Sequence, residues 1–126
     1  MNVRQGDLFW ISPNESNGIP SDHTHPYVVI HEDSVNIVVV CALTSNLKRA
    51  KELGNVLLDE GEGNLPRQSA VVVSQVSEVD KLQLGEYIGR LTEQRVSQVL
   101  AGIHFLQSIT QHHEHGNLDQ RWLSRL

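Results

Sequence analysis

THPYVVIHEDSVNIVVVCALTSNLKRAK, residues 24–51, is the stretch around which the chain is organised. It holds two apolar runs, Tyr27–Ile30 and Ile37–Leu43, and both are rich in Val and Ile. Such β-branched side chains favour strands, because they lose rotamer freedom in a helix. The segment between the two runs is short and polar, so the stretch predicts an antiparallel hairpin.

Polar side chains gather at the open end of this hairpin. They are His23 and His25 before the first strand, and Thr44, Ser45 and Asn46 after the second. The two ends of an antiparallel pair lie side by side, so we expect these histidines and hydroxyls to converge. A basic cluster of Lys48, Arg49 and Lys51 follows directly. This end of the hairpin is therefore the predicted functional site.

The composition is typical of a soluble, folded domain. The 126 residues include 20% charged and 39% hydrophobic side chains, enough for one domain with a buried core. No apolar run approaches the roughly 20 residues that span a bilayer, and the N-terminus has no apolar signal core. The lone Cys41 cannot form an internal disulfide, so we expect a small buried side chain in a cytoplasmic protein. Because the net charge is −5, contact with a nucleic acid would have to come from a local basic patch.

The rest of the chain alternates short apolar runs with loops. Strands are predicted at 3–12, 55–59, 69–76 and 85–91, loops at 12–20 and 60–67, and one helical turn within 77–84. A helix is predicted from the N-cap Thr92 to about Ser108, because apolar residues recur at helical spacing. These are Val96, Val99, Leu100, Ile103 and Leu106. Short strands with a single late helix predict a mainly β, α+β fold, with a small, strongly bent sheet or barrel.

The segment after the helix is polar and rich in histidine. We assign residues 1–110 to a single domain and 111–126 to a C-terminal tail. His112, His113 and His115, with Glu114, are residue types that bind zinc or nickel. Adjacent histidines on a tail rarely form a closed site, so we expect no metal and no other cofactor. A metal-responsive protein that uses this tail is one alternative function.

The histidines before the first strand are the candidate acid and base. His23 and His25 point to the same side if their segment is extended. Histidine titrates near neutral pH, so such a pair can deprotonate a nucleophile and protonate a leaving group. Thr44 and Ser45 can bind a phosphate through hydroxyl and backbone N–H groups. For all of these residues, and for the basic cluster, an ordinary solvated or strand-end role is the alternative.

Five segments of the chain, taken in order, resemble the PemK/MazF family of toxin endoribonucleases. They are VRQGDLFWI, HPYVVI, VVVCALTS, QSAVVVSQVSEVDK and YIGRLT, followed by a closing helix, and together they cover about residues 3–107. The resemblance implies an SH3-like bent β-barrel, a homodimer, and metal-independent cleavage of single-stranded RNA through attack of the ribose 2′-hydroxyl. It also implies a cognate antitoxin, whose disordered tail covers the RNA groove of the toxin.

The resemblance also assigns roles to individual positions. Thr44 matches the catalytic threonine of the family, whereas His25 stands where the family usually has arginine. In the Val-rich strand Gln75 is retained, while Val72 and Ser74 stand where some members have Arg and Asp. The expected catalytic residues are therefore His25, Thr44 and His23. The expected RNA-binding residues are Ser45, Lys48, Arg49, Lys51, Ser74 and Gln75.

The histidine at position 25 changes the chemistry that the family match implies. Arginine offers phosphate a fixed fork of donors, whereas histidine offers fewer donors and can also move protons. Either His25 and His23 have taken over acid–base work, or catalysis is reduced. The leading hypothesis is thus an RNA-cleaving toxin. The alternative is a weakened relative that binds RNA or an antitoxin-like partner without cleavage.

Overall fold

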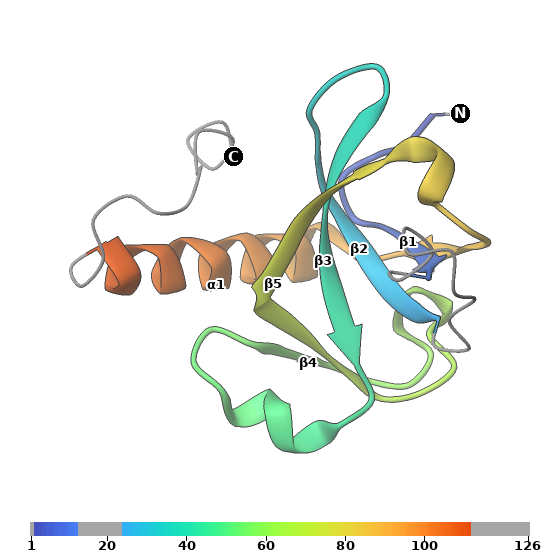
Figure 1. The fold of residues 1–126 in the computed structure, drawn as a ribbon. Coiled ribbons are helices and arrows are strands. Elements are labelled where there is room, and N and C mark those ends of the chain that lie inside the picture. The colour runs from blue at the N-terminus through green and yellow to red at the C-terminus, as the bar shows by residue number, and fades with distance from the viewer. Residues whose placement is uncertain (1, 13–23, 112–126) are drawn as a thin grey trace.

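The computed structural model describes residues 2–12 and 24–111. The strands are β1 (Asp7–Ile11), β2 (His25–Glu32), β3 (Ile37–Thr44), β4 (Val56–Leu58), β5 (Ser69–Asp80) and β6 (Tyr87–Arg90). The helices are the short 3-10 turns η2 (Leu47–Lys51), η3 (Glu62–Asn64) and η4 (Lys81–Gln83), and the α-helix α1 (Glu93–Gln111). Within these residues the six strands form one antiparallel sheet in the order β4-β5-β3-β2-β1-β6. Figure 1 shows a strongly curled sheet with α1 across it, which confirms the predicted mainly β, barrel-like fold with a late helix.

The predicted hairpin is confirmed and consists of β2 and β3. Its register places Tyr27 opposite Ala42 and Val28 opposite Cys41. At the turn, the N–H groups of Asp33 and Ser34 donate to the carbonyl of Ile37, at 3.0 and 3.2 Å. The turn therefore closes the hairpin at the end away from His25 and Thr44.

Both faces of the central strand β3 are buried. Val39 and Cys41 enter one hydrophobic core, and Val38 and Val40 enter a second core on the opposite face. Residues of α1 cover the first core, and residues from the N-terminal segment and the η4–β6 connection cover the second. A strand buried on both faces has no need of polar alternation, which explains its continuous run of apolar residues.

A bulge interrupts the pairing of β3 with β5. Cys41 pairs with Val76, yet two residues further along β3 Leu43 pairs with Val71. β5 therefore has extra residues between these pairs, and such an insertion bends a strand and increases its twist. The bulge thus contributes to the curl of the sheet seen in Figure 1.

Two side chains bind the backbone groups of this bulge. The thiol of Cys41 donates to the carbonyl of Val72 at 3.1 Å, and the N–H of Val73 donates to Oδ1 of Asn55 at 3.0 Å. Cys41 is fully buried, as predicted, and this burial raises the pKa of its thiol to about 12. Cys41 is therefore a neutral donor to a backbone carbonyl of the bulge, and this bond helps to satisfy polar groups in the interior.

β5 is longer than predicted from the sequence. The predicted strand ended at residue 76, but β5 continues to Asp80, and the predicted helical turn is confined to η4. Residues 77–80 pair with β3 from Val40 back to Ile37. The prediction was wrong here because three of these four residues are polar and give no clear strand pattern; backbone pairing with the apolar β3 makes them a strand.

The helix α1 begins where the sequence predicts and extends beyond its expected end at Ser108. The hydroxyl of Thr92 accepts a hydrogen bond from the N–H of Arg95 at 3.2 Å, as an N-cap residue does. Val99 and Ile103 are buried in the core, on the face that packs against β5 and β4. Of the helices in the described ranges, none is both long and apolar enough to cross a membrane.

Some expectations fall on residues outside the described ranges. They concern His23, most of the loop predicted at 12–20, and the tail histidines His112, His113 and His115. The division between a domain over 1–110 and a tail over 111–126 also stays a prediction.

Gly102 allows α1 to approach the chain between η2 and β4. A Cβ atom at position 102 would collide with the carbonyl oxygen of Gly54, which is backbone and cannot rotate away. The side chain of Val73 lies against the same position, so there is no free space for a methyl group. The distance between the helix and the sheet is thus set by a glycine.

We predict that Gly102→Ala destabilises the protein by about 1–3 kcal/mol, the usual effect of overpacking. In an exposed helix the same change would stabilise by about 1 kcal/mol, so the sign of the effect identifies the close contact. The measurement is urea unfolding, with the exposed helical change Ser97→Ala as the control. A Gly102→Ala protein more stable than the parent would show that α1 does not pack closely against Gly54.

An ion pair joins α1 to η3. Nε and Nη2 of Arg95 donate to the two carboxylate oxygens of Glu62, each at 2.9 Å, and Glu62 also accepts from the N–H of Asp59 at 2.7 Å. The hydrogen bonds from Arg95 lower the pKa of Glu62 from its ordinary value near 4.5, and partial burial opposes them. A carboxyl group with a lowered pKa in the folded state stabilises the fold above the ordinary pKa and loses that effect as the pH falls through the lowered one.

We therefore predict that Glu62→Gln lowers the free energy of unfolding at pH 7 by about 1 kcal/mol. The difference between variant and parent should shrink as the pH falls below 4.5, where Glu62 takes up a proton. Urea unfolding at a series of pH values measures this difference. A deficit that stays constant down to pH 3 would mean that the carboxylate charge contributes nothing.

Candidate functional site

His25 and Thr44 lie opposite each other at one end of the sheet. His25 is the first residue of β2 and Thr44 the last of β3. Continuing the Tyr27–Ala42 register by two residues places them side by side on neighbouring strands, on one face of the sheet. His25 is exposed and Thr44 is half-buried, so a ligand can reach both side chains.

The residues after β3 hold the Thr44 hydroxyl in place. Its oxygen accepts a hydrogen bond from the N–H of Asn46 at 3.1 Å, and Oδ1 of Asn46 accepts from the N–H of Lys48 at 3.2 Å. Because the Thr44 oxygen acts as an acceptor inside the turn, its proton can be donated outward. Asn46 is the N-cap of η2, which therefore starts directly beside this hydroxyl.

The basic cluster lies on η2, next to this end of the sheet. Nε and Nη2 of Arg49 donate to Glu52 at 3.0 and 3.2 Å, and this interaction lowers the pKa of Glu52 and raises that of Arg49. The charge of Arg49 is therefore balanced within the turn. Lys48 and Lys51 are exposed and form no ion pair within the described ranges.

A pocket of about 460 Å³ opens beside His25. Its lining comes from four separate segments and consists of Trp10, Thr24, His25, Pro26, Ser45, Pro66, Arg67 and Ser69. β5 runs antiparallel to β3 and pairs Ala70 with Thr44, so the segment that leads into β5 reaches the end of β3. This pairing brings Arg67 to the same pocket as His25 and Ser45.

Arg67 is a site residue that the sequence reasoning missed. It is exposed, and its guanidinium makes no hydrogen bond or ion pair with the residues in the described part of the chain. Its backbone is fixed, because the hydroxyl of the buried Ser69 donates to the Arg67 carbonyl at 3.0 Å. The sequence placed Arg67 at the end of an ordinary loop. The available signal was that the next residues begin the strand beside Thr44.

Three other candidate residues, Thr44, Ser74 and Gln75, do not line this pocket. Ser74 and Gln75 are exposed on β5, in the bulge opposite Ala42. Ala42 lies two residues before Thr44 on β3. Tyr27 follows His25 on the same face of β2, and burial, with a smaller effect of Cys41, raises the pKa of its phenol.

Within residues 2–12 and 24–111, no group of three or more His, Cys, Asp or Glu side chains could hold a metal ion.

Residues 4–106 match the family of PemK-like, MazF-like toxins of type II toxin–antitoxin systems. This match covers more than half of the 126 residues. The chain belongs to this family.

Solved structures of MazF-like proteins share its fold. An endoribonuclease from a mycobacterial species, in complex with its cognate antitoxin, superimposes with a TM-score of 0.69 at 14% identity, covering 86% of this chain and 97% of that one. A second mycobacterial endoribonuclease gives 0.66 at 15% identity, covering 86% and 94%. The toxin MazF-mt6 of Mycobacterium tuberculosis gives 0.64 at 17% identity, covering 81% and 96%. At such identities the likeness shows the MazF-like fold, while the roles of single residues rest on this chain's own geometry.

Proposed function

We propose that this MazF-like toxin is an endoribonuclease that cleaves single-stranded RNA without a metal ion. The observation that carries the proposal is the placement of His25 opposite Thr44, beside a pocket that also contains Ser45 and Arg67. A proton-transfer group, hydroxyl donors and a cation thus surround one space. Family membership and a fold shared with endoribonucleases support the same activity.

The proposed reaction is transesterification at the ribose. The 2′-oxygen attacks the adjacent phosphorus, a new O2′–P bond forms, and the P–O5′ bond breaks. The 2′-hydroxyl loses one proton and the leaving 5′-oxygen gains one, so the products are a 2′,3′-cyclic phosphate and a 5′-hydroxyl. DNA lacks the attacking group and is not cleaved.

Arg67 and His25 can take different roles in the proposed reaction. Where the family usually has arginine this chain has His25, yet Arg67 lines the same pocket. Arginine binds phosphate oxygens through a rigid fork of donors and stays charged, so Arg67 can stabilise the negative charge of the transition state. His25 is then available for proton transfer, and Thr44 and Ser45 donate to the non-bridging oxygens.

The RNA strand would extend from the pocket over η2. Lys48 and Lys51 are exposed cations that can contact backbone phosphates, and Arg49 can exchange Glu52 for a phosphate. Ser74 and Gln75 offer neutral hydrogen bonds on the neighbouring β5. Since the chain has a net charge of −5, such local contacts must provide the attraction.

We predict that His25→Ala slows cleavage of a mixed-sequence RNA by roughly 10²-fold or more in the presence of EDTA. Thr44→Ala should also slow cleavage, because the hydroxyl that binds the phosphate is lost. The exposed helical change His104→Ala is the matched control and should cut at the parental rate. Products are identified by their cyclic phosphate ends. A His25→Ala protein that cuts as fast as the parent would remove His25 from the mechanism.

Further variants at Arg67 and His25, in the same assay, distinguish phosphate binding from proton transfer. Arg67→Ala should slow cleavage, Arg67→Lys should recover part of the rate, and Arg4→Ala, which removes an exposed cation outside this pocket, should have no effect. His25→Arg should lower activity in an intact fold, because arginine cannot exchange protons near neutral pH. Raised activity in His25→Arg would show instead that position 25 serves as the phosphate clamp.

We also propose a homodimer and an antitoxin as partners. A second copy would place two sets of basic residues along one RNA groove, which a chain of net charge −5 needs. An antitoxin segment that occupies the pocket of His25 and Arg67 would exclude RNA. One of the structures with this fold is a complex of an endoribonuclease with its cognate antitoxin.

Light scattering at micromolar concentration tests the oligomeric state. We expect a mass twice that of the 14.1 kDa chain. A mass that stays at the monomer value while RNA is still cleaved would show that one copy holds a complete site.

A further inference from the structure

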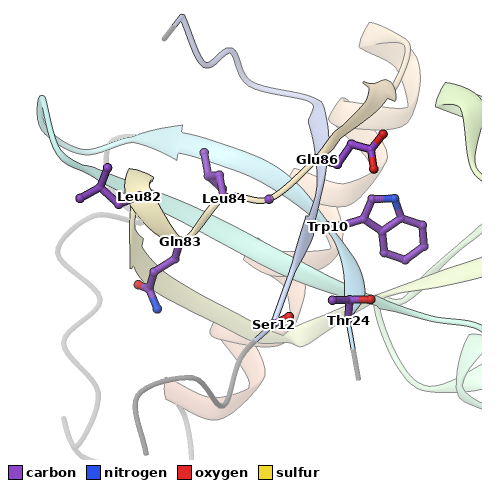
Figure 2. Close-up of a pocket in the computed structure, with 8 residues that line it drawn as sticks. Trp10, Ser12, Thr24, Leu82, Gln83, Leu84 and Glu86 are labelled. Carbon is purple, nitrogen blue, oxygen red and sulfur yellow. The ribbon is translucent and has the colours of Figure 1, made fainter. Parts of the chain in front are cut away.

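A second pocket lies beside the first and shares Trp10 and Thr24 with it. Its volume is about 590 Å³, within the range of roughly 300–1,000 Å³ common for small-molecule sites. The residues that line it are Trp10, Ser12, Thr24, Leu82, Gln83, Leu84, Gly85 and Glu86 (Figure 2). Trp10 therefore belongs to both pockets, and a group bound in the second would adjoin a phosphate bound in the first.

Backbone hydrogen bonds fix this second pocket against β1. The N–H of Trp10 donates to the carbonyl of Glu86 at 2.9 Å, and the N–H of Gly85 donates to the carbonyl of Trp10 at 2.8 Å. A Cβ atom at position 85 would collide with that Trp10 carbonyl, so a glycine permits the close approach. The chain around Glu86 is thus held rigidly beside the tryptophan.

Gln83 is already in use within the fold. Its Oε1 accepts a hydrogen bond from the N–H of Asp80 at 2.9 Å, and the Asp80 carboxylate accepts from the N–H of Leu82 at 2.8 Å. This capping box secures η4 at the edge of the pocket. Gln83 therefore shapes the pocket, and its side-chain oxygen is unavailable to a ligand.

Glu86 contributes a carboxylate and Trp10 an aromatic ring to this lining, beside the hydroxyl-bearing residues Ser12 and Thr24. Figure 2 shows the carboxylate of Glu86 and the indole of Trp10 on the same side of β1. Glu86 is exposed, and its carboxylate forms no hydrogen bond or ion pair with the residues that the structure describes. The indole is half-buried and offers a flat apolar face. A planar ring beside a carboxylate acceptor suits a flat ligand that carries hydrogen-bond donors on its edge.

We propose that this pocket binds the base next to the cleaved bond and prefers guanine, an inference that rests on the proposed function. The indole stacks on the base, as aromatic side chains do with unpaired nucleotides. The carboxylate of Glu86 accepts from N1–H and N2–H₂, two parallel donors that only guanine presents on that edge. Adenine and cytosine place a ring-nitrogen acceptor beside their single amino group, and uracil flanks its one N–H with two carbonyls. A carboxylate is repelled by these acceptors, so the charge selects guanine.

The alternative is a structural tryptophan that closes the end of the barrel. In that case Trp10 and Glu86 would affect stability, and RNA of any sequence would be cut equally. Specificity is therefore the decisive measurement, because a purely structural role does not change it.

The first test is binding of RNA that cannot be cut. The chain has two tryptophans, Trp10 and Trp122, so the Trp122→Phe protein reports on Trp10 alone. The probes are 2′-O-methyl oligonucleotides of uridine with one central guanine, one central inosine, or uridine throughout. We expect quenching of Trp10 fluorescence, with binding about 10-fold weaker for the all-uridine probe, and intermediate binding for inosine, which lacks the N2 amino group. Equal binding of all three probes would overturn the proposal.

The second test is the sequence around the cut sites in a random RNA pool. The parent should cut next to guanine, and Glu86→Gln should lose this preference while still cutting RNA. Glu60→Gln, which removes an exposed carboxylate outside both pockets, should keep the parental preference. If Glu86→Gln cuts RNA with the same base preference as the parent, the guanine pocket is overturned and the proposed function stays intact. If the parent neither binds nor cuts any RNA, the proposed function itself fails.

Discussion

β3 pairs with β2 on one side and with β5 on the other, and both of its faces are buried. The rest of the structure depends on this strand, because each hydrophobic core is packed against one of its faces. A polar residue in the middle of β3 would leave an unpaired group in a core, whichever way it pointed. The centre of the sheet is therefore held by pairing on both edges of β3 and by packing on both of its faces.

The antiparallel order around β3 also assembles the site. β1 ends, β2 begins, β3 ends and β5 begins at the same end of the sheet. Each of these ends contributes to the pocket beside His25, through Trp10, Pro26, Ser45 and Arg67 in turn. The proposed chemistry thus rests on side chains at strand ends or just beyond them, where the backbone is held by pairing and the side chain still reaches solvent.

The predictable part of this protein is the part with local sequence signals. The hairpin of residues 24–51, the buried Cys41 and the capped helix after Thr92 each follow from a pattern within a few residues, and all were found. Arg67 and Glu86 were not found, because what makes them candidates is pairing between distant segments. Likewise, residues 77–80 belong to β5 because they pair with the apolar strand β3, which is distant in the sequence. The proximity of His25 to Thr44 lies between these cases, since a hairpin needs only one turn to bring its ends together.

The hydrogen bond from Cys41 to Val72 has a practical consequence for solution work. Because burial raises the pKa of the thiol to about 12, the thiol stays protonated at pH 7, whereas the thiolate is the reactive form. The chain has no other cysteine, so the folded protein behaves towards maleimides and similar reagents as though it had none. Spectroscopic labels can therefore be attached at thiols introduced on the surface without removing Cys41. Labelling of Cys41 itself would then report on opening of the bulge between β3 and β5.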